Sequence, residues 1–235
     1  MSKNIVLVDG RISEGCIDSL LSLGYTPIKL PPMPTLPIAI ASHTDILAFK
    51  INTRIFLSRA YFDMFTSILS PLKDYNLILT DESQGVNYPL DAIFNGLIMG
   101  DRLFCKKDSF SKEILAFCER IGMQIIPTKQ GYPACTVLKI SENAAITADR
   151  GMQKALLGAG IDVLLIDNGD ISLPPYEYGF IGGAGEARGD DVYFFGDINS
   201  HRDAKKIIDF IEKHGKRAVS LSSNPLSDLG GMIFI

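Results

Sequence analysis

The chain has 235 residues, of which 46% are hydrophobic and 21% are charged, the composition of a soluble globular protein with a sizeable core rather than a disordered chain. The formal net charge of −4 provides no electrostatic footprint for DNA. No signal-peptide pattern opens the chain, and no apolar run approaches the roughly 18 residues of a membrane helix. We therefore predict a cytoplasmic protein with no DNA or membrane partner.

The cysteine and glycine patterns do not indicate a metal or a cofactor. The four cysteines form no Cys-x-x-Cys pair and do not cluster with the three histidines, which argues against a zinc site or a disulfide framework. The glycine-rich run from Gly179 to Asp191 would need a following helix to bind a dinucleotide, but a strand is expected there. This run is interpreted instead as a wide hairpin, or as a loop that covers a funnel-shaped ligand site at the centre of the fold.

Five similar units of about 47 residues follow one another along the chain. In the first, a strand at 4–8 precedes a helix capped by Ser13 and ended by Gly24, and a strand at 25–30 follows. The second unit has a strand at 54–57, a helix that Ser58 caps and Pro71 ends, and a strand at 76–80. A fixed period of this length is typical of repeat architectures.

The later units repeat the order strand, helix, strand. The predicted ranges are 102–106, 114–121 and 123–127 in the third unit, 144–147, 152–157 and 162–166 in the fourth, and 192–195, about 200–214 and 218–221 in the fifth. The expected helix caps are Ser109 or Ser111, then Asp149, then Asp197 or Ser200. One marker residue opens a further apolar strand in each unit, at spacings of 44 to 49 residues: Asp45, Asp91, Cys135, Gly179 and Asp228.

Short turns join four of the marker strands to the next strand, which indicates hairpins. The fifth marker strand, at 229–235, has no strand after it, and the strand at 4–8 has none before it. We expect these two to pair and to close a ring, because closure removes two sheet edges. The predicted fold is a single α/β domain over 1–235, a five-unit β/α-propeller with pseudo-fivefold symmetry.

A ring of five such units resembles the pentein fold, the five-bladed β/α-propeller of guanidino-group-modifying enzymes. The fold also occurs in a non-catalytic ribosome anti-association factor. Enzymes of this family carry a His-x-Asp motif in the third unit and a His-Cys pair in the fifth, where the Cys is the nucleophile. Here Pro133 and Cys135 occupy the third-unit positions, and the fifth unit keeps Gly230 and Gly231 but has neither His nor Cys. The usual catalytic pair is therefore missing from its usual positions.

Equivalent positions in a closed ring would bring the marker side chains towards the axis. Asp45, Asp91 and Asp228 would then grip a small cationic or amino-acid-like ligand such as a guanidinium. The alternative is that each Asp caps a turn or bonds a neighbouring backbone group. Three further candidates lie on the same strands and either line the opening or point outward: Lys50, Asn95 and Lys139.

Cys135 is the only thiol at a marker position, so it is a candidate displaced nucleophile, with His43 or His201 as the base. A buried, inert cysteine is the alternative. Three functions stay open. The first is an atypical pentein that binds a cationic ligand, the second a deiminase-like hydrolase of guanidino or amidino compounds, and the third a ribosome-type binding module.

Overall fold

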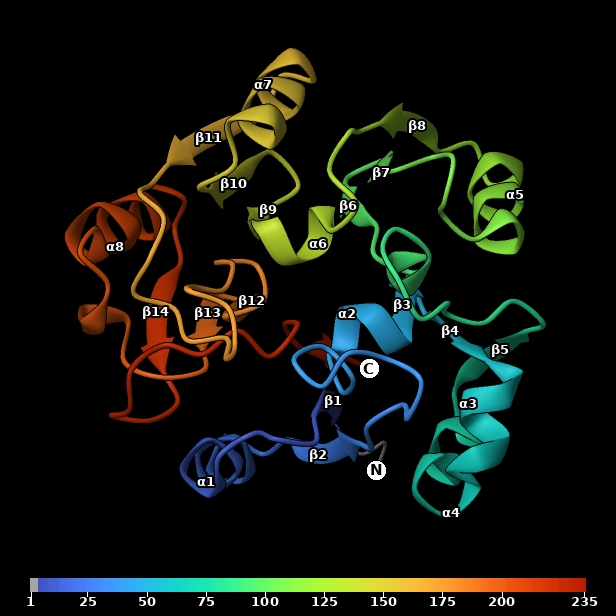
Figure 1. Cartoon of the computed structure of the whole chain (residues 1–235). Helices are drawn as coiled ribbons and strands as arrows, with labels where there is room; N and C mark the ends of the chain where they lie inside the picture. The colour runs from blue at the N-terminus through green and yellow to red at the C-terminus, as the bar shows by residue number, and fades with distance from the viewer. Residues whose placement is uncertain (1–3) are drawn as a thin grey trace.

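The computed structural model describes residues 4–235, and within them fifteen strands form five separate sheets of three strands each. Each sheet has a central strand with one antiparallel and one parallel neighbour. The sheets lie around a common centre, and the longer helices lie on the periphery (Figure 1). This arrangement directs one edge strand of every sheet towards the centre.

The first sheet joins segments from the two ends of the chain. β1 (Ile5–Asp9) lies between β2 (Thr26–Leu30), which is parallel to it, and β15 (Ile233–Phe234), which is antiparallel. Val6 pairs with Phe234 in this sheet. The predicted pairing of the terminal strands is thus confirmed, although β15 has only two residues and the expected strand at 229–235 is much longer. α1 (Glu14–Ser22) connects β1 to β2 and is capped by Ser13.

The other four sheets repeat this plan with consecutive strands. Their bounds are β3 (Ala48–Ile51), β4 (Arg54–Ser58) and β5 (Asn76–Thr80); β6 (Leu97–Met99), β7 (Arg102–Cys105) and β8 (Gln124–Pro127); β9 (Val137–Ser141), β10 (Ala144–Thr147) and β11 (Asp162–Leu165); and β12 (Gly185–Arg188), β13 (Asp191–Phe194) and β14 (Arg217–Ser220). β12 and β13 pair antiparallel, so the glycine-rich run contains the predicted hairpin.

The outer helices are α3 (Arg59–Met64), α4 (Thr66–Leu69), η1 (Ser70–Asp74), α5 (Lys112–Arg120), α7 (Arg150–Gly158), η3 (Ile198–Ser200) and α8 (Ala204–Lys213). Those of the second, third and fourth units begin at predicted caps, but the fifth-unit helix, predicted from about 200, begins only at Ala204, after an Asp203 side chain that makes no capping bond. The side chains of Ser58, Ser111 and Asp149 accept capping bonds from backbone N–H groups. The second-unit helix breaks at Phe65 and does not stop at Pro71, because proline is tolerated in the first turn of the following 3₁₀ helix.

Three marker residues lie in short helical turns, which corrects the prediction that each opens a strand. α2 (Thr44–Leu47) holds Asp45, η2 (Leu90–Ala92) holds Asp91, and α6 (Pro133–Thr136) holds Cys135. Each turn lies just before the inner part of its sheet, and α2 and α6 lie near the centre in Figure 1. The helical turn changes the chain direction there, so a strand-based alternation does not describe the marker side chains.

The hydrophobic core is divided into clusters that neighbouring units share. For example, Phe56 of β4 packs with Ile114 of α5, and Phe104 of β7 packs with Met152 of α7. Tyr193 of β13 packs with Val6 of β1 in the same way. Because each cluster needs two adjacent units, no unit buries its apolar face alone. Within residues 4–235 there is no helix of the length and apolarity that crossing a bilayer requires.

Candidate functional site

Side chains from the first and third units meet near the centre of the molecule. The Sγ atom of Cys135 donates a hydrogen bond of 2.7 Å to Oδ2 of Asp45. A ring nitrogen of His43, a carboxylate oxygen of Asp45 and this sulfur all lie within 4.8 Å of one another. His43 is the residue just before α2, so the same helical turn positions both its own side chain and that of Asp45.

Asn95 completes the surroundings of the thiol from the second unit. Its Nδ2 group donates a bond of 3.2 Å to Cys135 Sγ, and its Oδ1 atom accepts a bond of 2.8 Å from the backbone N–H of Ala134. The second bond fixes the orientation of the amide, so the N–H group faces the sulfur. Asn95, which was predicted to bind a ligand, thus makes its side-chain hydrogen bonds with the thiol of Cys135 and the backbone of Ala134.

Asp228 approaches the same region from the fifth unit. Its Oδ2 atom accepts a hydrogen bond of 2.8 Å from Phe180 N, and its Oδ1 atom accepts one of 3.1 Å from Gly230 N. His43 Nε2 lies 3.8 Å from Asp228 Oδ1. Both ring nitrogens of His43 are buried and have no hydrogen-bond partner among the described residues.

Asp9, which is buried, forms an ion pair with the exposed Arg11, and the sequence did not predict this pair. Arg11 donates from Nε to Oδ1 of Asp9 at 2.9 Å and from Nη2 to Oδ2 at 2.6 Å. Asp9 Oδ2 also lies 4.0 Å from His43 Nε2. The only sequence signal was an acidic residue at the end of an apolar strand, and it does not distinguish a site residue from a turn residue.

Burial determines the charge states of the site. Burial, followed by the nearby positive charge of Arg11, lowers the pKa of His43 to about 3. Burial raises the pKa of Asp45 to about 8 and that of Asp228 to about 6. Burial and the adjacent carboxylates raise the pKa of the Cys135 thiol well above its ordinary value. Near pH 7 the site therefore holds a neutral imidazole, a thiol and a largely protonated Asp45.

A cavity of about 560 Å³ opens onto this cluster, and His43, Cys135 and Asp228 form part of its wall. Asp91 lines the same cavity from the second unit and accepts a bond of 2.8 Å from Tyr132 Oη. Three of the four predicted axial residues, Asp91, Cys135 and Asp228, thus share one cavity. We refer to it below as the thiol cavity.

Asp45 lies between two cavities. Its Oδ2 atom bonds the thiol, but the residue lines a second cavity of about 370 Å³, to which the inner strands β3, β6, β9, β12 and β15 all contribute. Lys50 and Lys139 line this second cavity together with Glu186. These two predicted ligand residues are therefore not among those that line the thiol cavity.

His201 lies outside the central cluster. It follows η3 on the fifth unit, and its Nδ1 atom accepts a hydrogen bond of 3.0 Å from Asp203 N. Its Nε2 atom is buried without a partner among residues 4–235. The charged groups that act on its pKa are Asp170, Asp203, Arg202 and Asp167, none of which lines the thiol cavity. Of the two histidines considered as a base, the fold brings only His43 to the thiol.

The donor set of the cluster also fits a metal ion. Imidazole nitrogen, thiolate and carboxylate oxygen are the ligands that Zn²⁺ prefers, and three protein ligands leave one coordination position open. His43, Asp45 and Cys135 supply one such atom each within 4.8 Å. The sequence spacing did not indicate this arrangement, because 90 residues separate Asp45 from Cys135.

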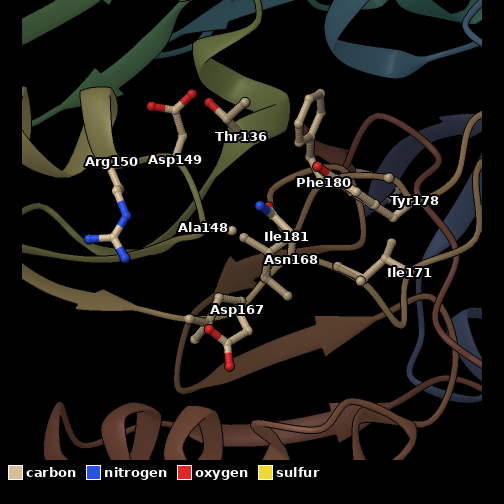
Figure 2. A pocket seen from close by; sticks show the side chains of 13 residues that line it. Thr136, Ala148, Asp149, Arg150, Asp167, Asn168, Ile171, Tyr178, Phe180 and Ile181 are labelled. Atoms are coloured by element: carbon tan, nitrogen blue, oxygen red, sulfur yellow. The ribbon is translucent and has the colours of Figure 1, made fainter.

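A further pocket lies beside the thiol cavity and shares Tyr178 and Phe180 with it. Figure 2 shows Arg150 across this pocket from Phe180, with Asp167 on its lower side. None of His43, Asp45 and Cys135 belongs to the pocket lining. Arg150 therefore does not contribute a positive charge to the wall of the thiol cavity.

Three solved structures share this arrangement of sheets. Agmatine deiminase from C. jejuni with substrate bound has 11% sequence identity and a TM-score of 0.56, over 99% of this chain and 93% of that one. Dimethylarginine dimethylaminohydrolase from Pseudomonas aeruginosa in complex with citrulline has 9% sequence identity and a TM-score of 0.55, over 95% of this chain and 93% of that one. An amidinotransferase of saxitoxin biosynthesis from Microseira wollei has 11% sequence identity and a TM-score of 0.55, over 93% of this chain and 89% of that one.

These neighbours are guanidino-modifying enzymes of the pentein fold, so the predicted fold family is confirmed. At such low identities the similarity shows the fold alone. Residues 7–233 match the model of a family described as DUF6873, a family of unknown function, and the chain belongs to that family. A comparison with curated proteins finds no match.

Proposed function

We propose that the protein binds a small guanidinium or amidinium cation in the thiol cavity and hydrolyses one of its C–N bonds with Cys135 as the nucleophile. The observation that carries this proposal is the meeting of His43, Asp45 and Cys135 within 4.8 Å, with His43 and Cys135 in the wall of the thiol cavity. A thiol, a neutral base and a carboxylate are the groups that nucleophilic attack on a cationic carbon requires.

The order of the groups around the fold supports the same conclusion. In the pentein enzymes the His-x-Asp motif and the nucleophilic Cys lie two units apart, in the third and fifth units. In this chain His43 and Asp45 form a His-x-Asp motif in the first unit, and Cys135 lies two units further on. The pair is therefore absent from its usual units but keeps its spacing around the centre.

The charge states give the cation a direct role. A guanidinium stays protonated at any ordinary pH, so its arrival beside Asp45 favours the carboxylate and opposes the burial that raises the pKa of Asp45. The same positive charge favours the thiolate of Cys135, and Asn95 donates a hydrogen bond to the sulfur. His43 has no hydrogen-bond partner among the described residues and lies beside the thiol, so we assign it as the acceptor of the thiol proton. Because burial lowers its pKa to about 3, it holds that proton only while the thiolate and the Asp45 carboxylate are charged beside it.

The proposed reaction has two steps. The Cys135 thiolate forms a C–S bond to the guanidinium carbon, one C–N bond breaks, and the departing nitrogen takes the proton from His43 and leaves as an amine or as ammonia. A water molecule then attacks the same carbon and gives one proton to His43, the C–S bond breaks, and the sulfur takes that proton and returns as the thiol, while the second proton of the water leaves with the departed nitrogen as ammonium. Overall, a guanidinium and a water give a neutral ureido product and an ammonium ion, so atoms and charge balance.

The architecture proposed with this function is a closed five-unit propeller with pseudo-fivefold symmetry around the two cavities. Two observations support it: β1 pairs with β15, and one inner strand from each of the five sheets lines the cavity beneath Asp45. Closure would place the thiol cavity and the cavity beneath Asp45 at opposite ends of one axis.

Covalent labelling with 2-chloroacetamidine tests the proposal. This amidinium carries a leaving group, so a thiol that is activated by a bound cation is alkylated at one equivalent per chain, which intact mass measures. We expect labelling at Cys135, and we expect agmatine to protect the thiol from it. The Cys135→Ser variant should show no labelling and should release no ammonia from guanidinium compounds. Cys16→Ser provides the matched control, because Cys16 is a buried thiol of α1 in another part of the fold.

An unlabelled Cys135 in folded protein would overturn the nucleophile. If the same protein still gained thermal stability with guanidinium compounds, the ligand-binding function without hydrolysis would replace the enzyme. If neither labelling nor a thermal shift occurred, the proposed function would fail.

A further inference from the structure

We propose that the second cavity, whose wall includes Asp45 but not Cys135, binds a small organic carboxylate between the ammonium groups of Lys50 and Lys139. This site is independent of the proposed function, because neither the thiol nor His43 belongs to the wall of the second cavity. Two features of that wall carry the proposal: a pair of lysines whose charges have no partner, and an apolar surface beside them.

Lys50 and Lys139 occupy matching places in two of the five inner strands. Lys50 is the third residue of β3, and Lys139 is the third residue of β9. The residues on either side of each lysine in its strand are core residues, whereas both lysines are partly exposed. Because side chains alternate along a strand, both lysines are directed away from the core, and both line the second cavity.

Neither ammonium group has a counterion among residues 4–235. No hydrogen bond or ion pair involves the side chain of Lys50 or of Lys139 within this range. Burial, followed by the nearby positive charge of Arg188, lowers the pKa of Lys50, and the charge of Lys139 acts in the same direction. A partly buried charge without a partner is unfavourable, and an anion that bridges two such charges relieves both penalties.

The acidic side chains of the second cavity do not neutralise its cations. They are Asp45, Glu142 and Glu186. Burial raises the pKa of Asp45 to about 8 and that of Glu186 to about 7, so near pH 7 the first is largely protonated and the second partly. Against them stand the two lysines and Arg188, which also lines the cavity. The wall therefore keeps a net positive charge, which the single charge of a carboxylate balances.

The rest of the wall favours an anion that carries a short apolar chain. The inner strands β6 and β15 contribute Ile98 and Ile233, and Phe94, Leu97 and Met232 line the cavity as well. Its volume of about 370 Å³ accommodates a ligand of several heavy atoms. Inorganic phosphate fits this wall less well, because it carries more than one negative charge near pH 7 and has no apolar part.

Probes with the same carbon chain and different head groups test the site. They are butanoate, butanamide and butylammonium, with inorganic phosphate as a second anion. Amide chemical shifts of the isotope-labelled full chain give both the dissociation constants and the place of binding. We expect butanoate to bind about tenfold more tightly than butanamide, and more tightly than phosphate, because only the carboxylate pairs with both lysines and contacts the apolar wall. Butylammonium should not shift the amides of β3 and β9.

Four variants locate the charges that matter. Lys50→Gln and Lys139→Gln should each weaken butanoate binding about tenfold, because each removes one ammonium group. Glu186→Gln should tighten binding, since it removes a partial negative charge from the wall. Lys154→Gln, at an exposed lysine of α7, is the matched control and should bind butanoate as the wild type does.

Equal binding of butanoate and butanamide, or an unchanged butanoate affinity in both lysine variants, would overturn the site. Tighter binding of phosphate than of butanoate would overturn the carboxylate as its ligand. If neither lysine variant folds, Glu186→Gln decides, because weaker butanoate binding there contradicts a positively charged wall. Cys135→Ser should bind butanoate as the wild type does, so this site and the proposed function, which the labelling of Cys135 tests, can fail separately.

Discussion

Oδ2 of Asp45 accepts a hydrogen bond from the thiol of Cys135 across a distance of 2.7 Å, although the two residues are 90 positions apart in the chain. The bond connects the walls of two different cavities, because Asp45 lines one cavity and Cys135 lines the other. Burial raises the pKa of Asp45, and burial together with the Asp45 carboxyl raises that of the thiol, because a thiolate next to a carboxylate would place two negative charges in a buried site. Asp45 and Cys135 are thus both largely protonated until a cation arrives.

Cation binding should tighten as the pH rises towards 8. Below the raised pKa of Asp45, about 8, a bound cation must displace the carboxyl proton, so affinity should increase by up to about tenfold per pH unit and level off above pH 8. Calorimetry with agmatine in buffers of different ionisation enthalpy measures how many protons are released on binding. Asp45→Asn should bind weakly and without this slope; a flat profile for the wild type would contradict the assignment.

The Asp45 carboxyl should also make the folded state less stable as the pH rises. Its pKa is raised from 3.8 to about 8, so between these values the folded chain holds a proton that the unfolded chain has lost. The free energy of unfolding therefore falls with rising pH across this window. Relative to Asp45→Asn, the wild type should lose about 3 to 4 kcal/mol between pH 5 and 8, because each pH unit within this window is worth about 1.4 kcal/mol. Urea unfolding at both pH values measures this, with exposed Asp63→Asn as the control.

Gly183→Ala should disturb Asp228 and destabilise the fold. A Cβ atom at 183 would lie 1.8 Å from Asp228 Oδ1, and the carboxylate cannot move freely because the N–H groups of Phe180 and Gly230 hold it. We expect a loss of about 2 kcal/mol and weaker cation binding. Gly158→Ala, in α7 with open space around its Cβ position, should leave stability equal or slightly higher. Equal melting of the two variants would exclude this close packing.

Removal of residues 229–235 should abolish cooperative folding, because β1 would lose its antiparallel partner. A milder test is Phe234→Ala: the ring is 5% exposed and lies 4.9 Å from the ring of Tyr25. The cost should be about 3 to 5 kcal/mol in chemical denaturation. Ile38→Ala, at a side chain that is 87% exposed, should cost little. Normal melting of the truncated chain would show that the terminal pairing is dispensable.

The sequence predicted the five units because every unit uses the same local signals. Ser13, Ser58, Ser111 and Asp149 cap helices in the structure as expected, and each cap is a short-range pattern. Strand ends were less accurate. β15 has only two residues where a strand at 229–235 was expected, since Gly230 and Gly231 both take positive φ values and leave the extended conformation.

The candidate site was predicted in part, for a related reason. The marker spacing predicted that Asp91, Cys135 and Asp228 lie together, and the structure places them in the wall of one cavity, with His43 next to the thiol. It did not show that Lys50 and Lys139 line the opposite cavity, because the short helical turns before their strands change which side of the fold each residue faces. Asp9 and Arg11 are only two residues apart and pair locally, but the position of Asp9 beside His43 depends on a tertiary contact that no local pattern contains.

The two-residue strand β15 has a consequence for the chemistry of the thiol. Asp228 and Gly230 lie just before this strand, and Gly230 N holds the carboxylate next to His43. A short strand is the kind of element that opens by local unfolding without loss of the remaining structure. Each opening would release Asp228 and admit water to the thiol. In the absence of ligand, the rate at which a neutral reagent modifies Cys135 would therefore report how often the segment around β15 opens. A bound cation would lower this modification rate, because it would hold the chain end in place.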